Sequence, residues 1–141
     1  MRTVDVGSRL PQMSPADNEK ELAPRAILIV DDEPSIGFLL TEMLQSTGHP
    51  ILTAGSVSEA LTHLKSRPIA VLIVDVQLAG TDGIAFLQQA LEVDSRLLSI
   101  VMTGHGNIEL AVRAMKSGAA DFLTKPFEVE LVRQSVSRLL E

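Results

Sequence analysis

The sequence contains no cysteine, no tryptophan and no tyrosine, and four phenylalanines are its only aromatic residues apart from histidine. Without cysteine, neither a disulfide framework nor a thiolate metal site can form. No apolar run approaches the ~20 residues of a membrane-spanning helix, and the N-terminal residues lack the uninterrupted apolar core of a signal peptide. We therefore expect a cytoplasmic protein with no membrane partner.

Positive charge is also scarce, because 12 Lys and Arg residues stand against 18 Asp and Glu residues, for a formal net charge of −6. Non-specific binding to nucleic acids depends on Lys and Arg neutralising phosphates, so we expect no direct nucleic acid binding. Apolar residues, by contrast, make up 45% of the 141 residues. This composition is typical of a soluble globular domain with a single core.

The chain divides into two parts of different character. Residues 1–24 mix charged residues, Ser and Asn with three prolines, and they show neither strand nor helix periodicity. Such a segment has little apolar surface to offset the entropy lost on ordering, so we predict a flexible tail. In residues 25–141, short apolar runs alternate with amphipathic stretches, and this part is predicted to form one domain.

Five apolar runs predict β-strands at residues 26–30, 50–54, 70–74, 97–102 and 120–124. Apolar residues at helical spacing between and after these runs predict five helices. The predicted core stripe of the fourth helix consists of Ile108, Ala111, Val112 and Met115. Strands that alternate with helices form a parallel sheet through right-handed crossovers. The predicted fold is therefore α/β, a doubly wound five-stranded parallel sheet with helices on both faces.

Polar residues stand at the ends of several predicted strands. Asp31 and Asp32 follow the first strand, and Asp75 follows the third. Thr103 and Lys125 end the fourth and the fifth strand. The carboxyl ends of parallel strands meet at one edge of the sheet, where doubly wound folds bind their ligands. We therefore expect these side chains to gather at that edge.

The acidic residues of this set predict a magnesium site. Carboxylates crowded together repel one another unless a cation lies among them, and Mg²⁺ prefers oxygen ligands, including one or two carboxylates. Asp31, Asp32 and Asp75 suit this ion. Zinc is disfavoured because cysteine is absent and the histidines lie outside the set, and Ca²⁺ would lack its usual contiguous ligand loop.

A carboxylate, a magnesium ion, a lysine and a hydroxyl group together can carry out phosphoryl transfer to aspartate. Asp75 is the predicted acceptor because it ends the middle strand, whereas Asp31 and Asp32 are better placed as metal ligands. Lys125 would neutralise charge on the transferred group, and Thr103 would donate a hydrogen bond to it.

Four segments of the sequence, "ILIVDDEP", "VLIVDVQLAGTDG", "IVMTGHG" and "GAADFLTKPF", resemble in order the signature segments of the receiver domain (CheY-like) of two-component response regulators. The resemblance covers about residues 25–141, and the segment "TGHGNIELAVRAMKSGAADFLTKPFE" is most similar to receivers of transcriptional regulators of nitrogen metabolism. It implies a flavodoxin-like sheet with strand order 2-1-3-4-5.

The resemblance also implies how the acceptor site works. Asp75 would accept a phosphoryl group from a sensor histidine kinase. Mg²⁺ would be held by Asp31, Asp32 and Asp75, with help from the backbone carbonyl of Gln77. The domain itself would not be an enzyme beyond catalysing its own phosphorylation and dephosphorylation.

Further roles concern the switch that follows phosphorylation in this family. Lys125 would pair with the phosphoryl oxygens and would precede a cis peptide bond to Pro126. Thr103 would move toward the phosphoryl group, and an aromatic residue would follow it inward. That residue is Phe122 in this chain, where many relatives have Tyr.

Three loop residues would tune the chemistry of the site. Gln77 and His105 stand at positions that, in the family, affect the lifetime of the phosphoaspartate. Gly104 follows the switch threonine and would leave the site open to small phosphodonors.

The expected output surface lies on the fourth helix, the fifth strand and the fifth helix. In the family this face dimerises or contacts an effector or an output domain. Leu110 and Ala114 lie opposite the predicted core stripe of the fourth helix, and we expect them to form this face together with Phe122 and Leu131.

Three other functions share parts of this pattern. A pseudo-receiver would bind partners without being phosphorylated. A phosphatase with an aspartate nucleophile usually needs a second acid two residues later, where this chain has Gln77. A flavin-binding protein would share the architecture, but the carboxylates after the first strand would repel a phosphate, and no Trp or Tyr is present to stack on the flavin.

Overall fold

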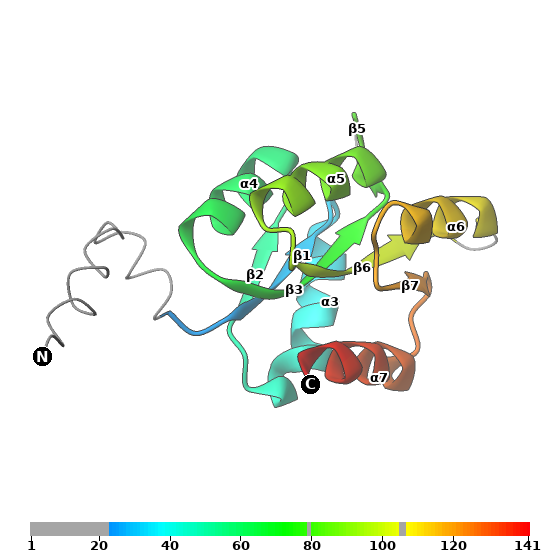
Figure 1. The fold of residues 1–141 in the computed structure, drawn as a ribbon. Coiled ribbons are helices and arrows are strands. Elements are labelled where there is room, and N and C mark those ends of the chain that lie inside the picture. Colours follow the sequence, from blue (N-terminus) through cyan, green and yellow to red (C-terminus); the bar gives the residue numbers. More distant parts are fainter. Residues whose placement is uncertain (1–22, 79, 105–106) are drawn as a thin grey trace, which may run out of the picture.

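The computed structural model describes residues 23–78, 80–104 and 107–141, and all structural statements below refer to these residues. Strands and helices alternate along the chain (Figure 1). The strands are β1 (Ala26–Val30), β2 (Ile51–Ala54), β3 (Ile69–Asp75), β4 (Gln77–Leu78), β5 (Thr81–Asp82), β6 (Leu98–Thr103) and β7 (Asp121–Thr124). The helices are α3 (Pro34–Leu44), followed by the 3₁₀ turn η2 (Gln45–Thr47), α4 (Val57–Ser66), α5 (Gly83–Val93), α6 (Ile108–Lys116) and α7 (Val129–Leu140).

The main sheet contains five parallel strands in the order β2-β1-β3-β6-β7. Counted among the strands of this sheet alone, the order is 2-1-3-4-5, which confirms the predicted flavodoxin-like topology. The predicted strand positions are correct to within one residue at each end. A second, antiparallel pair, β4 with β5, was not predicted from the sequence. It forms a short hairpin directly after β3.

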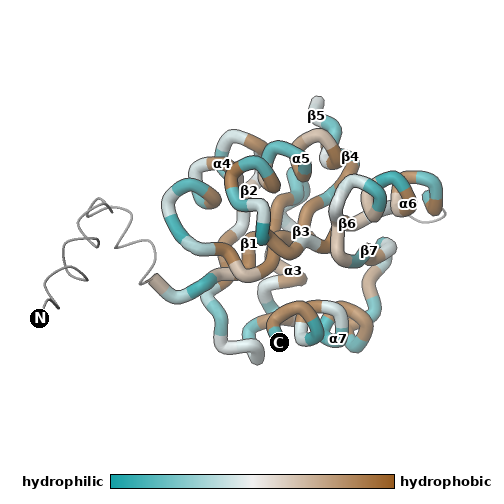
Figure 2. The backbone as a smooth tube through the Cα atoms, viewed as in Figure 1, coloured by the Kyte–Doolittle hydropathy of each residue, from teal (hydrophilic) through white to brown (hydrophobic). Residues whose placement is uncertain are grey.

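The central strands of the sheet are buried on both faces, and most of their residues are apolar. All seven residues of β3 are buried, and because successive side chains of a strand point to opposite faces, they contribute to two hydrophobic clusters. One cluster contains side chains from α4, α5 and α6, and the other contains side chains from α3 and α7. Figure 1 shows these helices on the two sides of the sheet, and Figure 2 shows apolar residues gathered along the central strands.

The orientation of α6 differs from the prediction. Ala111 is 2% exposed, as predicted, but Ala114 is fully buried and Leu110 packs against the core from a partly buried position, although both were expected on the output face. The exposed apolar side chains of this helix are instead Ile108, Val112 and Met115. The small alanine side chains allow the helix backbone to approach the sheet closely, and this leaves the larger side chains on the outside.

None of the helices among the described residues has both the length and the apolar composition that a membrane span needs.

Candidate functional site

The predicted polar residues meet at the carboxyl edge of the main sheet. Asp75 is the last residue of β3, and Asp31 directly follows β1. Both carboxylates are almost completely buried, at 5% residue exposure each. Lys125 follows β7, on the other side of Asp75 from β1, and its side chain reaches both of them.

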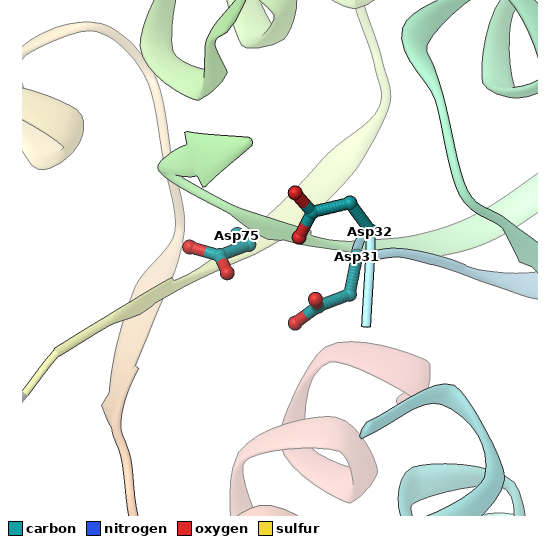
Figure 3. Close-up of side chains that lie close together, drawn as sticks. All are labelled: Asp31, Asp32 and Asp75. Atoms are coloured by element: carbon teal, nitrogen blue, oxygen red, sulfur yellow. The ribbon is translucent and has the colours of Figure 1, made fainter. Parts of the chain in front are cut away.

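Three carboxylates lie close enough together to share one metal ion. Asp31, Asp32 and Asp75 each offer an oxygen atom, and these atoms all lie within 4.8 Å of one another. Figure 3 shows Asp31 and Asp32 coming from the end of β1 and Asp75 from the end of β3. A set of carboxylate oxygens with one exposed member, Asp32, fits a hard divalent cation that keeps part of its water shell, as Mg²⁺ does.

A single ammonium group is shared among the acidic residues. Lys125 Nζ lies 2.7 Å from Asp75 Oδ2 and 3.0 Å from Asp31 Oδ2. It also lies 3.8 Å from Oε1 of Glu33, an exposed residue that sequence reasoning did not assign to the site. Burial lowers the pKa of Lys125, but the hydrogen bonds to the two aspartates outweigh burial and raise the pKa above its ordinary value. Lys125 therefore stays protonated at neutral pH.

Lys125 does not fully offset the effect of burial on the Asp31 carboxylate. Burial raises the pKa of Asp31, and this effect outweighs the hydrogen bond from the Glu33 amide, at 2.8 Å, and the contact with Lys125. The nearby charge of Asp75 adds to the increase. The site also contains more acidic groups than cations, because the carboxylates of Asp31, Asp32 and Asp75 lie beside the one ammonium group of Lys125.

Asp75 is fixed from a second side by the β4–β5 hairpin. The backbone amide of Gln77 donates a hydrogen bond to Asp75 Oδ1 at 2.8 Å, while Oδ2 accepts from Lys125. The Gln77 side chain is exposed. Its Oε1 lies 3.6 Å from the point that a Cβ atom would occupy on Gly104, so the residues that follow β3 and β6 approach each other here.

Thr103 and Phe122 lie beside the site in different environments. Thr103 ends β6 and is fully buried, and its hydroxyl oxygen has no hydrogen-bond partner among the described residues. Phe122 lies on β7 and is 39% exposed. The Lys125–Pro126 bond is cis, as the resemblance implied. His105 lies outside the described residues.

Comparison with known families decides the identity of this arrangement, because residues 27–137 match the response regulator receiver domain. The chain belongs to this family. The family prediction made from the four sequence segments is therefore confirmed, and the chain is a receiver domain of two-component response regulators.

The receiver domain is similar to those of transcriptional regulators. It is 38% identical over 120 residues to the C4-dicarboxylate transport transcriptional regulatory protein DctD of Pseudomonas aeruginosa, with 84% of this chain and 26% of that protein covered. It is 37% identical over 117 residues to the nitrogen assimilation regulatory protein NtrX of Azorhizobium caulinodans, with 82% of this chain and 26% of that protein covered. The chain thus spans about a quarter of the length of these relatives.

A solved structure supports the same assignment. The receiver domain of NtrX from Brucella abortus superposes with a TM-score of 0.77 at 36% sequence identity, covering 81% of this chain and 97% of that one. The predicted similarity to nitrogen-type receivers is therefore confirmed.

The output surface of the receiver domain needs a correction. Phe122 and Leu131 are exposed, at 39% and 52%, as expected for that face. Leu110 and Ala114 are not part of it, because α6 turns them toward the core. The apolar residues that α6 contributes to the surface are Ile108, Val112 and Met115. A groove of about 300 Å³ lies between β7 and α7 and is lined in part by Phe122 and Leu131.

Proposed function

We propose that this receiver domain accepts a phosphoryl group on Asp75 from the phosphohistidine of a sensor histidine kinase. The observation that carries the proposal is the double anchoring of the Asp75 carboxylate, by Lys125 at 2.7 Å and by the Gln77 amide at 2.8 Å. A nucleophile held in one orientation reaches its attacking geometry at little further cost in entropy.

The transfer exchanges one bond to phosphorus for another. A carboxylate oxygen of Asp75 forms a bond to phosphorus while the bond between phosphorus and the imidazole nitrogen of the donor breaks. The electron pair of the broken bond stays on that nitrogen. Lys125, protonated because of its raised pKa, then donates to the phosphoryl oxygens, and this positioning with charge neutralisation provides most of the catalysis.

Asp31, Asp32 and Asp75 would hold Mg²⁺ together with the backbone carbonyl of Gln77. The bound ion would supply charge neutralisation on the transferring phosphoryl group. The chain's own contribution is to bring the carboxylate oxygens within 4.8 Å of one another and to hold two of them, those of Asp31 and Asp75, against Lys125.

The hydroxyl of Thr103 supports a switch. A buried hydroxyl without a partner costs about 1–3 kcal/mol, and a phosphoryl oxygen on Asp75 would offer it an acceptor. We expect Thr103 to turn toward that oxygen and Phe122 to turn inward into the space released. Phosphorylation would then shift a pre-existing equilibrium between two states.

The proposed readout is the surface formed by α6, β7 and α7. Its exposed apolar residues suit a second copy of the domain or an output domain, because such residues become buried on association. The relatives named above are transcriptional regulatory proteins about four times as long as the matched region, and we propose that this receiver regulates an output domain of that kind.

Acetyl phosphate and Mg²⁺ provide a direct test, with intact-mass spectrometry as the readout. We expect wild-type protein to gain one phosphoryl group and Asp75→Asn to gain none. Asp94→Asn is the matched control, because Asp94 lies between α5 and β6 and its Oδ1 has local contacts with Arg96, a hydrogen bond from the amide at 3.0 Å and an ion pair with Nε at 3.7 Å. A wild-type protein that gains nothing, or an Asp75→Asn variant that gains as much, would contradict the proposal.

The same reaction separates the proposed function from a pseudo-receiver, and a turnover assay separates it from a phosphatase. A pseudo-receiver would form no adduct with acetyl phosphate or with beryllofluoride. A phosphatase would turn over phosphorylated metabolites many times, whereas a receiver takes up one phosphoryl group per chain. Gln77 at the position of the second acid argues against the phosphatase, because an amide cannot protonate a leaving group.

Residues near Asp75 are proposed to set the phosphoryl lifetime. The exposed Gln77 side chain lies beside Gly104, where an attacking water would approach. His105 is proposed for the same role from its place in the sequence. Gly104 is proposed to favour entry of small phosphodonors, because it has no side chain of its own.

A further inference from the structure

The chain folds back onto the acceptor immediately after β3. The amide of Val76 donates to the carbonyl of Met102 on β6 at 3.0 Å, so Val76 is still hydrogen-bonded to the main sheet. The β4–β5 hairpin comes next, with Gln77 paired with Asp82 and Leu78 paired with Thr81. The hairpin brings the chain back to the end of β3, and α5 begins there.

Gly83, the first residue of α5, contacts the main chain at the end of β3. Its amide donates to the carbonyl of Val76 at 3.0 Å. A Cβ atom added at Gly83 would overlap the carbonyl oxygen of Asp75 and would lie 2.5 Å from Cα and 2.9 Å from the carbonyl carbon of Val76. All three atoms belong to the backbone, so no side-chain rotation could relieve the overlap.

Glycine is needed at position 83 because two backbone segments approach closely there, and not because of its backbone dihedral angles. Gly83 is absent from the described glycines with positive φ, so another residue could adopt its dihedral angles. Any side chain would instead push the start of α5 away from the main chain of Asp75. Because Asp82 caps α5 through the Ile84 amide at 2.9 Å, the end of the hairpin would move with the helix.

We propose that Gly83 is a positioning residue for the phosphoacceptor: by seating the hairpin on the main chain of Asp75, it aims the Gln77 amide at Asp75 Oδ1. This inference rests on the proposed function of Asp75. Hydrogen bonds weaken steeply as distance and angle depart from their optimum, and the amide–carboxylate bond observed here is 2.8 Å long. A shift of the hairpin would therefore release one of the two anchors of the carboxylate.

Misplacement of a reacting group by about 1 Å can reduce a reaction rate by up to about 100-fold. We expect Gly83→Ala to slow phosphorylation of Asp75 by acetyl phosphate by at least about tenfold. The matched control is Gly55→Ala, because a Cβ atom on the exposed Gly55 would meet only the flexible end of Glu59, at 3.6 Å. This control should react at the wild-type rate.

An NMR measurement separates positioning from a general loss of structure. An amide proton that donates to a carboxylate resonates at high frequency, and its shift follows the ionisation of that carboxylate. We expect this signature for Gln77 in wild-type protein and in Gly55→Ala, and its loss in Gly83→Ala, while amides of α7, on the other face of the sheet from α5, keep their wild-type shifts. An unchanged Gln77 amide and an unchanged rate in Gly83→Ala would overturn the proposal.

The two proposals fail in different ways. If wild-type protein takes up no phosphoryl group, the proposed function fails, but the Gln77 amide still reports whether Gly83 positions the hairpin. If Gly83→Ala does not fold, Asp82→Ala provides the second variant. It removes the cap on the first turn of α5, which contains Gly83, without adding a side chain at position 83. A slower reaction with a displaced Gln77 amide then supports the proposal, and wild-type behaviour in both measurements contradicts it.

Discussion

Two aspartates of this receiver domain accept similar hydrogen bonds but differ in how many carboxylates lie beside their cation. Asp75 at the site accepts from the Gln77 amide and from Lys125. Asp121 on β7 accepts from the Phe122 amide at 2.8 Å and from two side chains of α7, Ser135 at 2.6 Å and Arg138 at 2.5 Å.

The difference lies in how many carboxylates share one cation. Among the residues that the structure describes, Arg138 pairs with Asp121 and no other carboxylate, whereas Lys125 lies between Asp75 and Asp31, with Asp32 close by. Burial raises the pKa of Asp121, but the hydrogen bonds from Ser135, Phe122 and Arg138 outweigh it, so the pKa falls below its ordinary value. For Asp31 the burial effect prevails and the pKa rises. In the balanced cluster, one carboxylate, Asp121, pairs with one cation and links β7 to α7. In the unbalanced cluster, several carboxylates share Lys125, and this arrangement is suited to bind a further cation.

The largest expected effect comes from removing the cation of the unbalanced cluster. Lys125→Met should lower the free energy of unfolding by about 3 kcal/mol without Mg²⁺, because it leaves buried carboxylates unpaired. Arg138→Met should cost only about 1 kcal/mol, because the Arg138 side chain is 62% exposed. Urea unfolding monitored by circular dichroism measures both values.

A control variant is available for the lysine substitution. Lys65→Met changes an exposed lysine on α4 and should alter stability by less than about 0.5 kcal/mol. Equal losses in Lys125→Met and Arg138→Met would show that the two clusters do not differ as described.

An intermediate effect is expected from Asp121→Asn. Because the folded pKa of Asp121 is lowered, its carboxylate stabilises the fold above the unfolded value of about 3.9, and this stabilisation disappears as pH falls through the folded pKa. The variant should lose about 1 kcal/mol at neutral pH, the worth of a typical hydrogen bond. Its stability should also vary less than that of wild type as the solution becomes acidic.

Urea titrations at a series of pH values test this prediction. The control is Asp94→Asn, whose aspartate pairs with an arginine that is 89% exposed. A wild-type acid dependence in Asp121→Asn would mean that the α7 contacts do not stabilise its charged form.

The smallest expected effect is an increase in stability, caused by Asp31→Asn. The folded pKa of Asp31 is raised, so its ionised form opposes folding at neutral pH, and this penalty decreases as pH falls toward the unfolded pKa. Asp31→Asn removes the charge and should raise the melting temperature in the presence of a chelator. Mg²⁺ should stabilise the wild-type protein more than the variant, because ligands that bind the native state raise its stability.

Calorimetric melting curves with and without Mg²⁺ check this result. The comparison fails if Asp31→Asn and Asp121→Asn shift the melting temperature in the same direction, or if Mg²⁺ stabilises wild type and Asp31→Asn equally.

The sequence was sufficient to predict the main sheet and the meeting of the charged residues at its edge. Apolar runs located the strands, and parallel strands place their carboxyl ends together, so the strand pattern alone put Asp31, Asp75 and Lys125 at one edge. The observed contacts among these three side chains agree with that placement. Their chemical roles stay predictions.

Other features depend on packing that periodicity does not encode. Helix α6 has apolar residues on more than one face, and the pattern could not tell that small residues such as Ala114 would face the sheet. The β4–β5 hairpin has only two residues in each strand, too few for an alternating pattern. The close approach of Gly83 to the main chain of Asp75 depends on the path of the hairpin, which the sequence pattern does not reveal.

The most direct test of Mg²⁺-dependent phosphoryl transfer to Asp75 is to locate the phosphoryl group by borohydride reduction, which converts phosphoaspartate to homoserine, followed by peptide mass spectrometry. The account predicts homoserine at position 75 after reaction with acetyl phosphate and Mg²⁺, and almost none when a chelator replaces Mg²⁺. Label on another residue, such as Asp121, or equal label at Asp75 without Mg²⁺, would contradict it.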